Sequence, residues 1–154
     1  MNSEYLLPRR RAIPLLGGFS LLNVIVMRTL SEKASRIFSA LLALNQSMID
    51  NGKFMPVHIE VFRTVNQFKE ISIAHYGSQN GDLMRDPEMI IIYDTRTGDY
   101  VPSYYRNDYA GIESFSAHVD NGYIVIRNKK IQADHADFAN QWLINIAEQQ
   151  HISI

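Results

Sequence analysis

The chain has 154 residues, of which 46% are hydrophobic and 20% are charged, so it can form one domain with a core and is too apolar for wholesale disorder. Fifteen basic and sixteen acidic residues give a net charge of −1, which excludes a global basic field for nucleic acid. The lack of cysteine excludes disulfides, thiolate metal sites and cysteine nucleophiles, and it fits a reducing cytoplasm.

The amino-terminal segment, residues 1–28, differs from the rest of the chain. Arg9–Arg11 precede an apolar run over 12–27, which is the outline of a secretory signal. Pro14 interrupts that run, no small-residue cleavage site follows it, and it is shorter than the roughly 20 residues of a membrane span. We therefore expect no membrane insertion. The segment is interpreted as an arm that packs on the domain, or as an upstream extension with Met27 as the natural start.

An amphipathic helix is expected to begin at Thr29. Thr29 and Glu32 have the spacing of a capping box, and apolar residues then recur at steps of three and four as far as Met48. Gly52 follows as a left-handed stop. The pattern predicts one helix that buries a single face in the core.

Beyond this helix the apolar period drops to two. Alternating or continuous apolar segments predict strands at 57–62, 71–76, 89–93, 114–119 and 123–126. Thr95–Gly98 and Asp120–Gly122 predict hairpin turns. Phe115 is assigned, with Ala117 and Val119, to one alternating face.

A second helix closes the chain. Asp134 is its expected N-cap, and an apolar stripe from Phe138 to Ile146 is expected to face inward. The order helix, strands, helix predicts an α+β domain over residues 29–154. Its sheet is expected to be a mostly antiparallel meander of five or six strands, flanked on one face by an N-terminal and a C-terminal helix.

The segment 77–88 joins two predicted strands and is longer than an ordinary hairpin loop of about 2–5 residues. It contains the turn former Asn80-Gly81 and the dipeptide Asp86-Pro87, which requires an extended or turn geometry. We interpret it as a long loop. Such a loop either carries function or is a turn whose Asp and Asn side chains cap its own backbone.

One histidine and three carboxylates around this loop offer ligands for a divalent ion. The candidate ligands are His75, Asp82, Asp86 and Glu88. Their spacing matches neither an EF-hand nor an H-E-x-x-H site, and His75 shares the parity of Ile71 and Ile73, which favours a hydrogen-bonded histidine at the sheet end. No metal and no cofactor is predicted, and no complete catalytic constellation is found. A metal-dependent hydrolase that uses the 75–88 loop stays open as an alternative.

The middle of the chain is acidic and rich in tyrosine. Residues 76–113 contain six of the eight tyrosines, and three basic and seven acidic residues give this segment a charge of −4. Such a segment repels a phosphate backbone but suits a protein-binding surface. The predicted contact residues are Gln79, Asn80, Asp82, Arg85, Asp86, Glu88, Tyr100, Tyr104, Tyr105 and Tyr109. The alternative is that the tyrosines pack along strand edges with their hydroxyls in water.

The same region resembles a family signature. The run His75-Tyr76…Gln79-Asn80-Gly81-Asp82-Leu83-Met84-Arg85-Asp86-Pro87-Glu88-Met89 is similar to that of an uncharacterised bacterial domain family, as are Pro102, Asn107-Asp108 and the closing Phe138, Trp142, Asn145 and Gln149. The resemblance covers about Leu30 to Gln150. It implies small proteins encoded on conjugative plasmids, integrative elements and phages, and it implies no activity.

These observations predict a cytoplasmic, non-enzymatic domain that binds another protein. It would act as an accessory or regulatory factor of a mobile genetic element, with inhibition of a host defence system as one such role. The metal-dependent hydrolase is the first alternative. The second is nucleic-acid binding through Arg9–Arg11 and Lys129-Lys130, which the overall charge disfavours.

Overall fold

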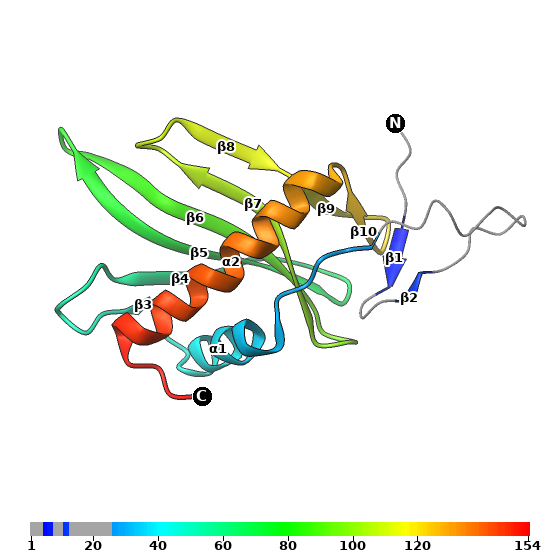
Figure 1. Cartoon of the computed structure of the whole chain (residues 1–154), viewed down its shortest axis with the longest axis horizontal. Helices are drawn as coiled ribbons and strands as arrows, with labels where there is room; N and C mark the ends of the chain where they lie inside the picture. Colours follow the sequence, from blue (N-terminus) through cyan, green and yellow to red (C-terminus); the bar gives the residue numbers. More distant parts are fainter. Residues whose placement is uncertain (1–4, 8–10, 13–25) are drawn as a thin grey trace, which may run out of the picture.

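The computed structural model describes residues 5–7, 11–12 and 26–154. Two sheets and two helices make up this part of the chain (Figure 1). Residues 1–4, 8–10 and 13–25, which include Arg9 and Arg10 of the triple arginine, lie outside the described residues. Neither described helix is both long enough and apolar enough to cross a membrane.

The larger sheet confirms the predicted antiparallel meander. Its six strands lie in sequence order from β3 to β8, and each is antiparallel to its neighbours. The turn Thr95–Gly98 connects β6 to β7, as predicted. The strands are β3 (Met48–Ile49), β4 (Val57–Val65), β5 (Phe68–Gln79), β6 (Asp82–Asp94), β7 (Asp99–Asn107) and β8 (Ile112–Phe115).

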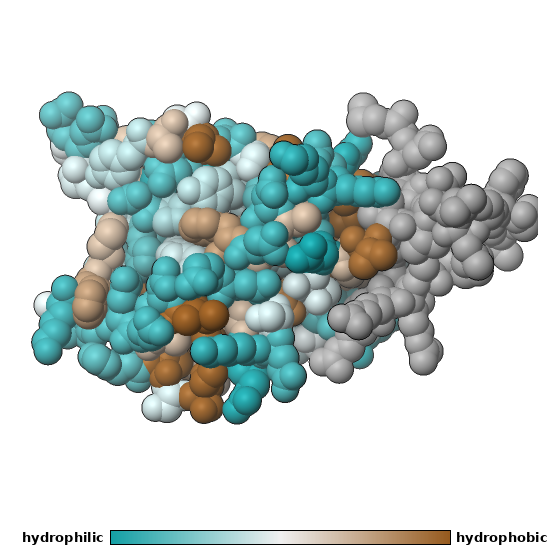
Figure 2. Space-filling view, in the orientation of Figure 1, coloured by the Kyte–Doolittle hydropathy of each residue, from teal (hydrophilic) through white to brown (hydrophobic). Residues whose placement is uncertain are grey.

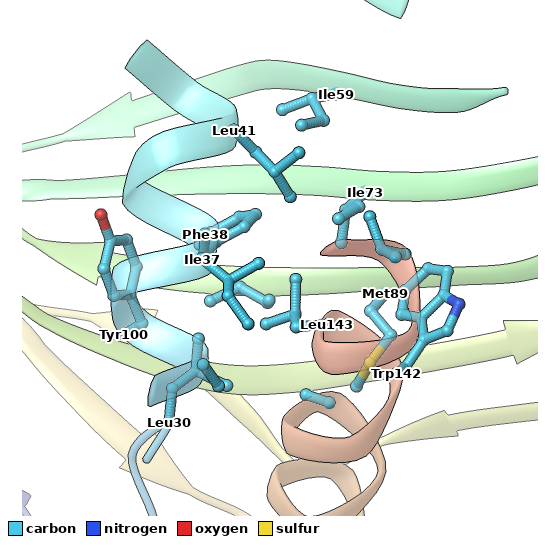
Figure 3. Packing of buried hydrophobic residues seen from close by; sticks show 14 of the residues in the cluster. Leu30, Ile37, Phe38, Leu41, Ile59, Ile73, Met89, Tyr100, Trp142 and Leu143 are labelled. Carbon is cyan, nitrogen blue, oxygen red and sulfur yellow. The ribbon is translucent and has the colours of Figure 1, made fainter. Parts of the chain in front are cut away.

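Two helices, α1 (Glu32–Ala43) and α2 (Lys129–Gln150), lie side by side across one face of this sheet (Figure 1). The main hydrophobic core lies between them and the sheet. Phe38 and Leu143 extend from the two helices toward Ile73 and Met89 of the strands (Figure 3), and all four side chains are fully buried. Burial of a large apolar side chain stabilises a fold by about 1.5–3 kcal/mol, so this cluster fixes the helices on the sheet.

A smaller sheet packs on part of the opposite face. Its strand order is β2-β1-β10-β9, and the strands are β1 (Tyr5–Leu7), β2 (Arg11–Ala12), β9 (Ala117–Asp120) and β10 (Tyr123–Ile126). Asn121-Gly122 forms the predicted turn between β9 and β10. Val119 and Ile126 belong to one buried cluster with Ile92 and Val101 of the large sheet, whose neighbours Ile91 and Tyr100 face the helices. The smaller sheet therefore covers the large sheet near the β6–β7 turn.

The predicted strand over 114–119 is divided between the two sheets. β8 ends at Phe115, Ser116 is completely buried, and β9 begins at Ala117. Phe115 is 64% exposed, so its side chain does not share the burial of Ala117 and Val119. The single alternating face expected for these three residues was wrong at Phe115, because the chain passes from one sheet to the other at Ser116.

The predicted helix boundaries need correction. The N-cap of α1 is Ser31, whose hydroxyl accepts from the backbone N–H of Ala34, and the helix ends at Ala43. Asn45 adopts a left-handed conformation (φ 52°), after which Met48 belongs to β3. Met48 has the spacing of the apolar helix residues only by coincidence. It lies in β3, where it pairs with His58 of β4.

The second helix begins earlier than predicted. Its N-cap is Asn128, whose side chain accepts from the backbone N–H of Ile131 (3.0 Å), and Asp134 lies inside the helix. Because the helix begins earlier, Gln132 lies within it, and its side chain is buried. Its Nε2 donates to the carbonyls of Arg28 (2.8 Å) and Pro102 (3.1 Å).

Candidate functional site

The segment 77–88 is the end of a long β-hairpin and not a loop. β5 and β6 remain paired up to Gln79 and Asp82, and Asn80-Gly81 forms the two-residue turn between them. Both turn residues have positive φ (52° and 84°), which is the geometry of the tight turns that match the twist of the strands. The predicted long loop was therefore wrong, although the turn former inside it was recognised correctly.

The β5–β6 hairpin and the neighbouring β7–β8 turn extend together from one end of the sheet (Figure 1). We call residues 76–88 and 104–113 the hairpin end. Five acidic residues and two arginines give it a charge of −3. Figure 2 shows mainly hydrophilic side chains over the tip and a small hydrophobic group near β8.

Two hydrogen bonds between Asp108 and the backbone of Arg85 fasten the β7–β8 turn to β6. The backbone N–H of Asp108 donates to the carbonyl of Arg85 (3.0 Å), while Oδ2 of Asp108 accepts from the backbone N–H of Arg85 (2.8 Å). Asn107 Nδ2 adds a bond to Asp86 Oδ1 (3.3 Å). The N–H of Arg85 and then the guanidinium of Arg106, 2.6 Å from Oδ1, lower the pKa of Asp108. Asp108 is thus held as a carboxylate that joins two strands.

Tyr109 fastens the same turn to β5. Its ring lies against Gly77, and its hydroxyl donates to the carbonyl of Ser78 (3.3 Å). The side chain is nevertheless 48% exposed. Tyr109 therefore both holds the hairpin end together and presents an aromatic surface to solvent.

The predicted contact residues at the hairpin separate into two groups. Gln79, Asn80 and Asp82 are exposed at the tip. Arg85, Asp86 and Glu88 are only partly exposed. Arg85 and Asp86 make the contacts with Asp108 and Asn107 described above. Arg85 Nε lies 2.6 Å from Glu88 Oε2. These three residues hold the hairpin end in shape, and only the tip residues are free to contact a partner broadly.

The predicted tyrosines also separate by burial. Tyr100 is 5% exposed and hydrogen-bonded to the Ser39 hydroxyl (2.8 Å), which places it in the main core. Tyr104 is 8% exposed, and burial together with the hydrogen bond that it donates to Glu113 (2.8 Å) raises its pKa to about 12. Tyr105 is half-buried against Phe138 of α2. Of the four tyrosines, only Tyr109 is exposed.

The metal-ligand candidates do not converge. His75 is buried on the helix-covered face, where Nδ1 is 2.9 Å from the carbonyl oxygen of Pro56 and the ring contacts Trp142 edge-on. This hydrogen-bonded histidine is what the strand parity favoured. Glu88 is bonded to Ser72 (2.8 Å) instead. Within residues 5–7, 11–12 and 26–154, no three His, Asp or Glu side chains lie close enough to hold a metal ion.

The basic residues proposed for nucleic acid are not brought into one described cluster. Lys129 and Lys130 are exposed at the start of α2, and Lys130 is 4.0 Å from Asp134. Arg9 and Arg10 lie outside the described residues, so no geometry relates them to the lysines. The described surface near the tip of the sheet is acidic instead.

An open polar groove of about 770 Å³ lies between α1 and the start of β7. Its charged lining residues are Glu32, Arg36 and Asp99, and the hydroxyls of Ser39 and Tyr100 meet beside it. Because it is next to the β6–β7 turn, it lies at the other end of the strands from the hairpin tip. The groove and the hairpin end are thus separate features.

Residues 26–152 match a protein family whose description is "Domain of unknown function (DUF6908)". The chain belongs to this family. The match is consistent with the uncharacterised family expected from the sequence over about Leu30 to Gln150. No curated protein and no solved structure matches the chain. The DUF6908 domain comprises both helices, the six-stranded sheet and the β9–β10 hairpin, whereas β1 and β2 precede it.

Three exposed apolar residues of the DUF6908 domain were not predicted as contact residues. Leu83, beside the hairpin tip, is 69% exposed; Ile112 and Phe115 lie at the two ends of β8, and both are exposed. Leu83 and Ile112 each follow a glycine-containing turn closely in the sequence. Large apolar residues beside turns are the signal that could have identified them, because such positions rarely reach a core.

A buried histidine was also missed. His135 of α2 has Nδ1 2.7 Å from the hydroxyl of Ser116 and Nε2 2.8 Å from that of Ser114. Burial lowers its pKa to about 4, and only 4% of the residue is exposed. A neutral imidazole can donate to one hydroxyl and accept from the other. The arrangement connects α2 to the junction of β8 and β9, and substrate has no access to the fully buried Ser116.

Proposed function

We propose that this DUF6908 protein is a non-enzymatic protein-binding domain and that the hairpin end is its contact surface. One observation carries the proposal: two turns that are fastened to each other expose Leu83 and Tyr109 within a surface of charge −3. Exposed apolar anchors within a charged rim are typical of protein interfaces. Rigid turns lower the entropy lost on binding.

The partner that fits this surface is a protein with a basic rim around an apolar recess. Complementary charge would guide the encounter, and Leu83 and Tyr109 would supply the buried contact. The biological setting follows from the resemblance of the central segment: a cytoplasmic accessory or regulatory factor of a mobile genetic element, with inhibition of host defence as one such role. Family-level association supports this setting, and the hairpin geometry supports the binding surface.

The test is affinity capture with the full chain as bait in its native host, followed by mass spectrometry and by binding measurements on each purified partner. Leu83→Asp places a charge on the expected apolar contact without removing a described hydrogen bond of the fold. A partner of the hairpin end should lose about tenfold or more in affinity, since contact residues at the centre of an interface commonly contribute this much.

Phe62→Asp is the control, because Phe62 is also an exposed apolar residue (45%, against 69% for Leu83) and lies on β4, away from the hairpin end. Binding should survive this change. The proposal fails if every captured partner binds the Leu83→Asp variant as tightly as the wild-type protein. It also fails if Phe62→Asp is the variant that abolishes binding.

A further inference from the structure

β8 is an edge strand, and no described strand pairs with its outer side. It is the last strand in the six-stranded sheet and pairs only with β7 among the described strands (Figure 1). Just beyond β8, the backbone N–H of Ser116 donates to the carbonyl of Ser103 in β7 (2.9 Å). Antiparallel pairing alternates residues that bond to the neighbouring strand with residues that bond away from it. The N–H and C=O groups of Glu113 and Phe115 therefore point away from β7.

The opposite edge of the sheet carries protective features that β8 lacks. There the two-residue strand β3 pairs only with Val57 and His58 of β4, so the rest of β4 forms the edge. Along this part of β4 the register shifts between Val61 and Arg63, and Arg63 is exposed. Bulges and positive side chains are ordinary devices that prevent strand addition. β8 has neither lysine, arginine nor proline, and its pairing with β7 runs without a shift from Ile112 to Phe115.

Neighbouring residues of β7 hold the side chains of Glu113 and Phe115, the two residues whose backbone groups point away from β7. The ring of Phe115 packs against that of Tyr104 at a tilt of 54°, with ring centroids 4.8 Å apart, and the Tyr104 hydroxyl donates to Glu113. Arg106 Nη1 lies 3.8 Å from the same carboxylate. Glu113 and Phe115 thus share one face of the strand, with a carboxylate and an exposed aromatic ring two residues apart.

We propose that β8 binds an extended segment of the partner protein as an added antiparallel strand. The proposal rests on the protein-binding function proposed above and specifies how the partner is recognised. Main-chain bonds to Glu113 and Phe115 would hold the segment, as in other strand-addition complexes. In an antiparallel arrangement the residue opposite Phe115 precedes the residue opposite Glu113 by two positions. The segment therefore has the pattern apolar, any residue, basic.

A second copy of this chain fits the edge less well. Two antiparallel β8 strands related by a twofold axis must place residues of the same face opposite each other. Centring the pair on Glu113 opposes two carboxylates, which destabilises the pairing. Centring it on Ser114 places Glu113 opposite Phe115, which satisfies neither side chain. Centring it on Phe115 would place Glu113 opposite Ala117, which belongs to β9 of the smaller sheet. The charge of −3 at this end favours a basic segment of a different protein.

The experiment selects peptides from a random decapeptide library displayed on phage, with the full chain as target. Enriched peptides are then synthesised with blocked termini and bound to the isotope-labelled protein. The expected result is an apolar-any-basic pattern, with new protection from hydrogen exchange at the amides of Glu113 and Phe115. Glu113→Lys should convert the preference at the basic position to an acidic residue.

Substitutions at Phe115 separate main-chain recognition from side-chain contact. Phe115→Ala removes the ring alone, whereas Phe115→Pro also removes the outward N–H and leaves the bonds to β7 in place. Peptide affinity should fall about tenfold further in the proline variant than in the alanine variant, as expected for one lost hydrogen bond. If the proline variant does not fold, main-chain recognition is tested in the wild-type protein, by the protection of the Glu113 and Phe115 amides from hydrogen exchange when the peptide binds.

Strand addition is refuted if the selected peptides lack the pattern, if they protect β4 or other amides, or if the protein instead forms a dimer through β8. The binding function itself fails differently. If the captured partner is lost with Leu83→Asp but is unaffected by Phe115→Pro, the hairpin end is a contact surface without strand addition. If neither change alters partner binding, both proposals are wrong.

Discussion

The ring of Tyr109 occupies the space in which a side chain at Gly77 would begin. A β-carbon built on Gly77 would meet the Tyr109 hydroxyl well inside contact distance and would lie 3.1 Å from Cε2 of the ring. The backbone of Gly77 does not have positive φ, so any residue could adopt its conformation. Glycine is therefore required by the tyrosine and not by the turn.

This relationship predicts that the effect of Gly77→Ala depends on Tyr109. In the wild-type background, the alanine should displace the ring, break its bond to Ser78 and lower the free energy of unfolding by about 1 kcal/mol. In a Tyr109→Ala background the same change should stabilise by about 0.5–1 kcal/mol, since glycine is unfavourable within a strand. Urea unfolding of the four proteins measures the coupling. If the effects of Gly77→Ala and Tyr109→Ala on the free energy of unfolding were additive, the two residues would not be in contact.

His135 predicts a dependence of stability on pH. The folded protein holds this histidine with a pKa of about 4, whereas the unfolded chain has the ordinary value of 6.5. Between these values the unfolded state binds the additional proton, so the free energy of unfolding should fall as the pH decreases from 6.5 to 4. The total loss is about 3 kcal/mol. It is fully regained above pH 6.5.

The measurement is chemical denaturation at several pH values between 4 and 7. His135→Gln should be less stable than wild type at pH 7 but should lose most of this pH dependence, because glutamine does not titrate. His151→Gln, a change at an exposed histidine after α2, is the control and should keep the wild-type slope. A His135→Gln variant with an unchanged slope would assign the pH dependence to other groups.

The large sheet was predictable because its strands carry a burial signal. Ile71 and Ile73 alternate with less buried residues under the helices, and the continuous run 89–93 lies where the sheet is covered on both faces. Periodicity records which face is buried. The same argument placed His75 on the buried face with Ile71 and Ile73, and the structure confirms this position.

The hairpin end was not predictable by that route. Residues 78–83 are exposed, so alternation carries no burial signal there even though the strands are paired. Only the turn former Asn80-Gly81 marked the correct geometry. Burial also determines which tyrosines can contact a partner. Tyr100 contacts Phe38 and Tyr93 in the core, and Phe38 comes from a distant part of the chain. Local composition could not separate Tyr100 from the exposed Tyr109.

The N-cap of α1 gives a direct comparison between prediction and structure. Ser31→Ala should lower the free energy of unfolding by about 1 kcal/mol, because it removes the acceptor for the Ala34 N–H. Thr29→Ala should change it by less than about 0.5 kcal/mol, since Thr29 precedes the cap. Thermal unfolding of both variants distinguishes the two caps. A larger effect at Thr29 would restore the predicted capping box.

The cap of α2 offers an independent test of the same kind. Asn128→Ala removes the acceptor for the Ile131 N–H and should cost about 1 kcal/mol. Asp134→Ala removes only an exposed partner of Lys130 within the helix, and such pairs contribute about 0.5 kcal/mol or less. If Asp134 were the N-cap, as predicted from the sequence, Asp134→Ala would be more destabilising than Asn128→Ala. Urea midpoints of the two variants, compared at one pH, decide between them.

Asp108 should control how firmly the hairpin end is held. Asp108→Ala removes the carboxylate that accepts from the Arg85 N–H and that pairs with Arg106. The Arg85 amide should then exchange with solvent about tenfold faster, as expected when one hydrogen bond is lost. Asp82→Ala changes an exposed carboxylate at the tip and should leave this amide unchanged. Hydrogen exchange followed by NMR measures both variants. Equal rates at Arg85 in wild type and Asp108→Ala would mean that the β7–β8 turn is not what orders the hairpin, and the rigid contact surface would lose its structural basis.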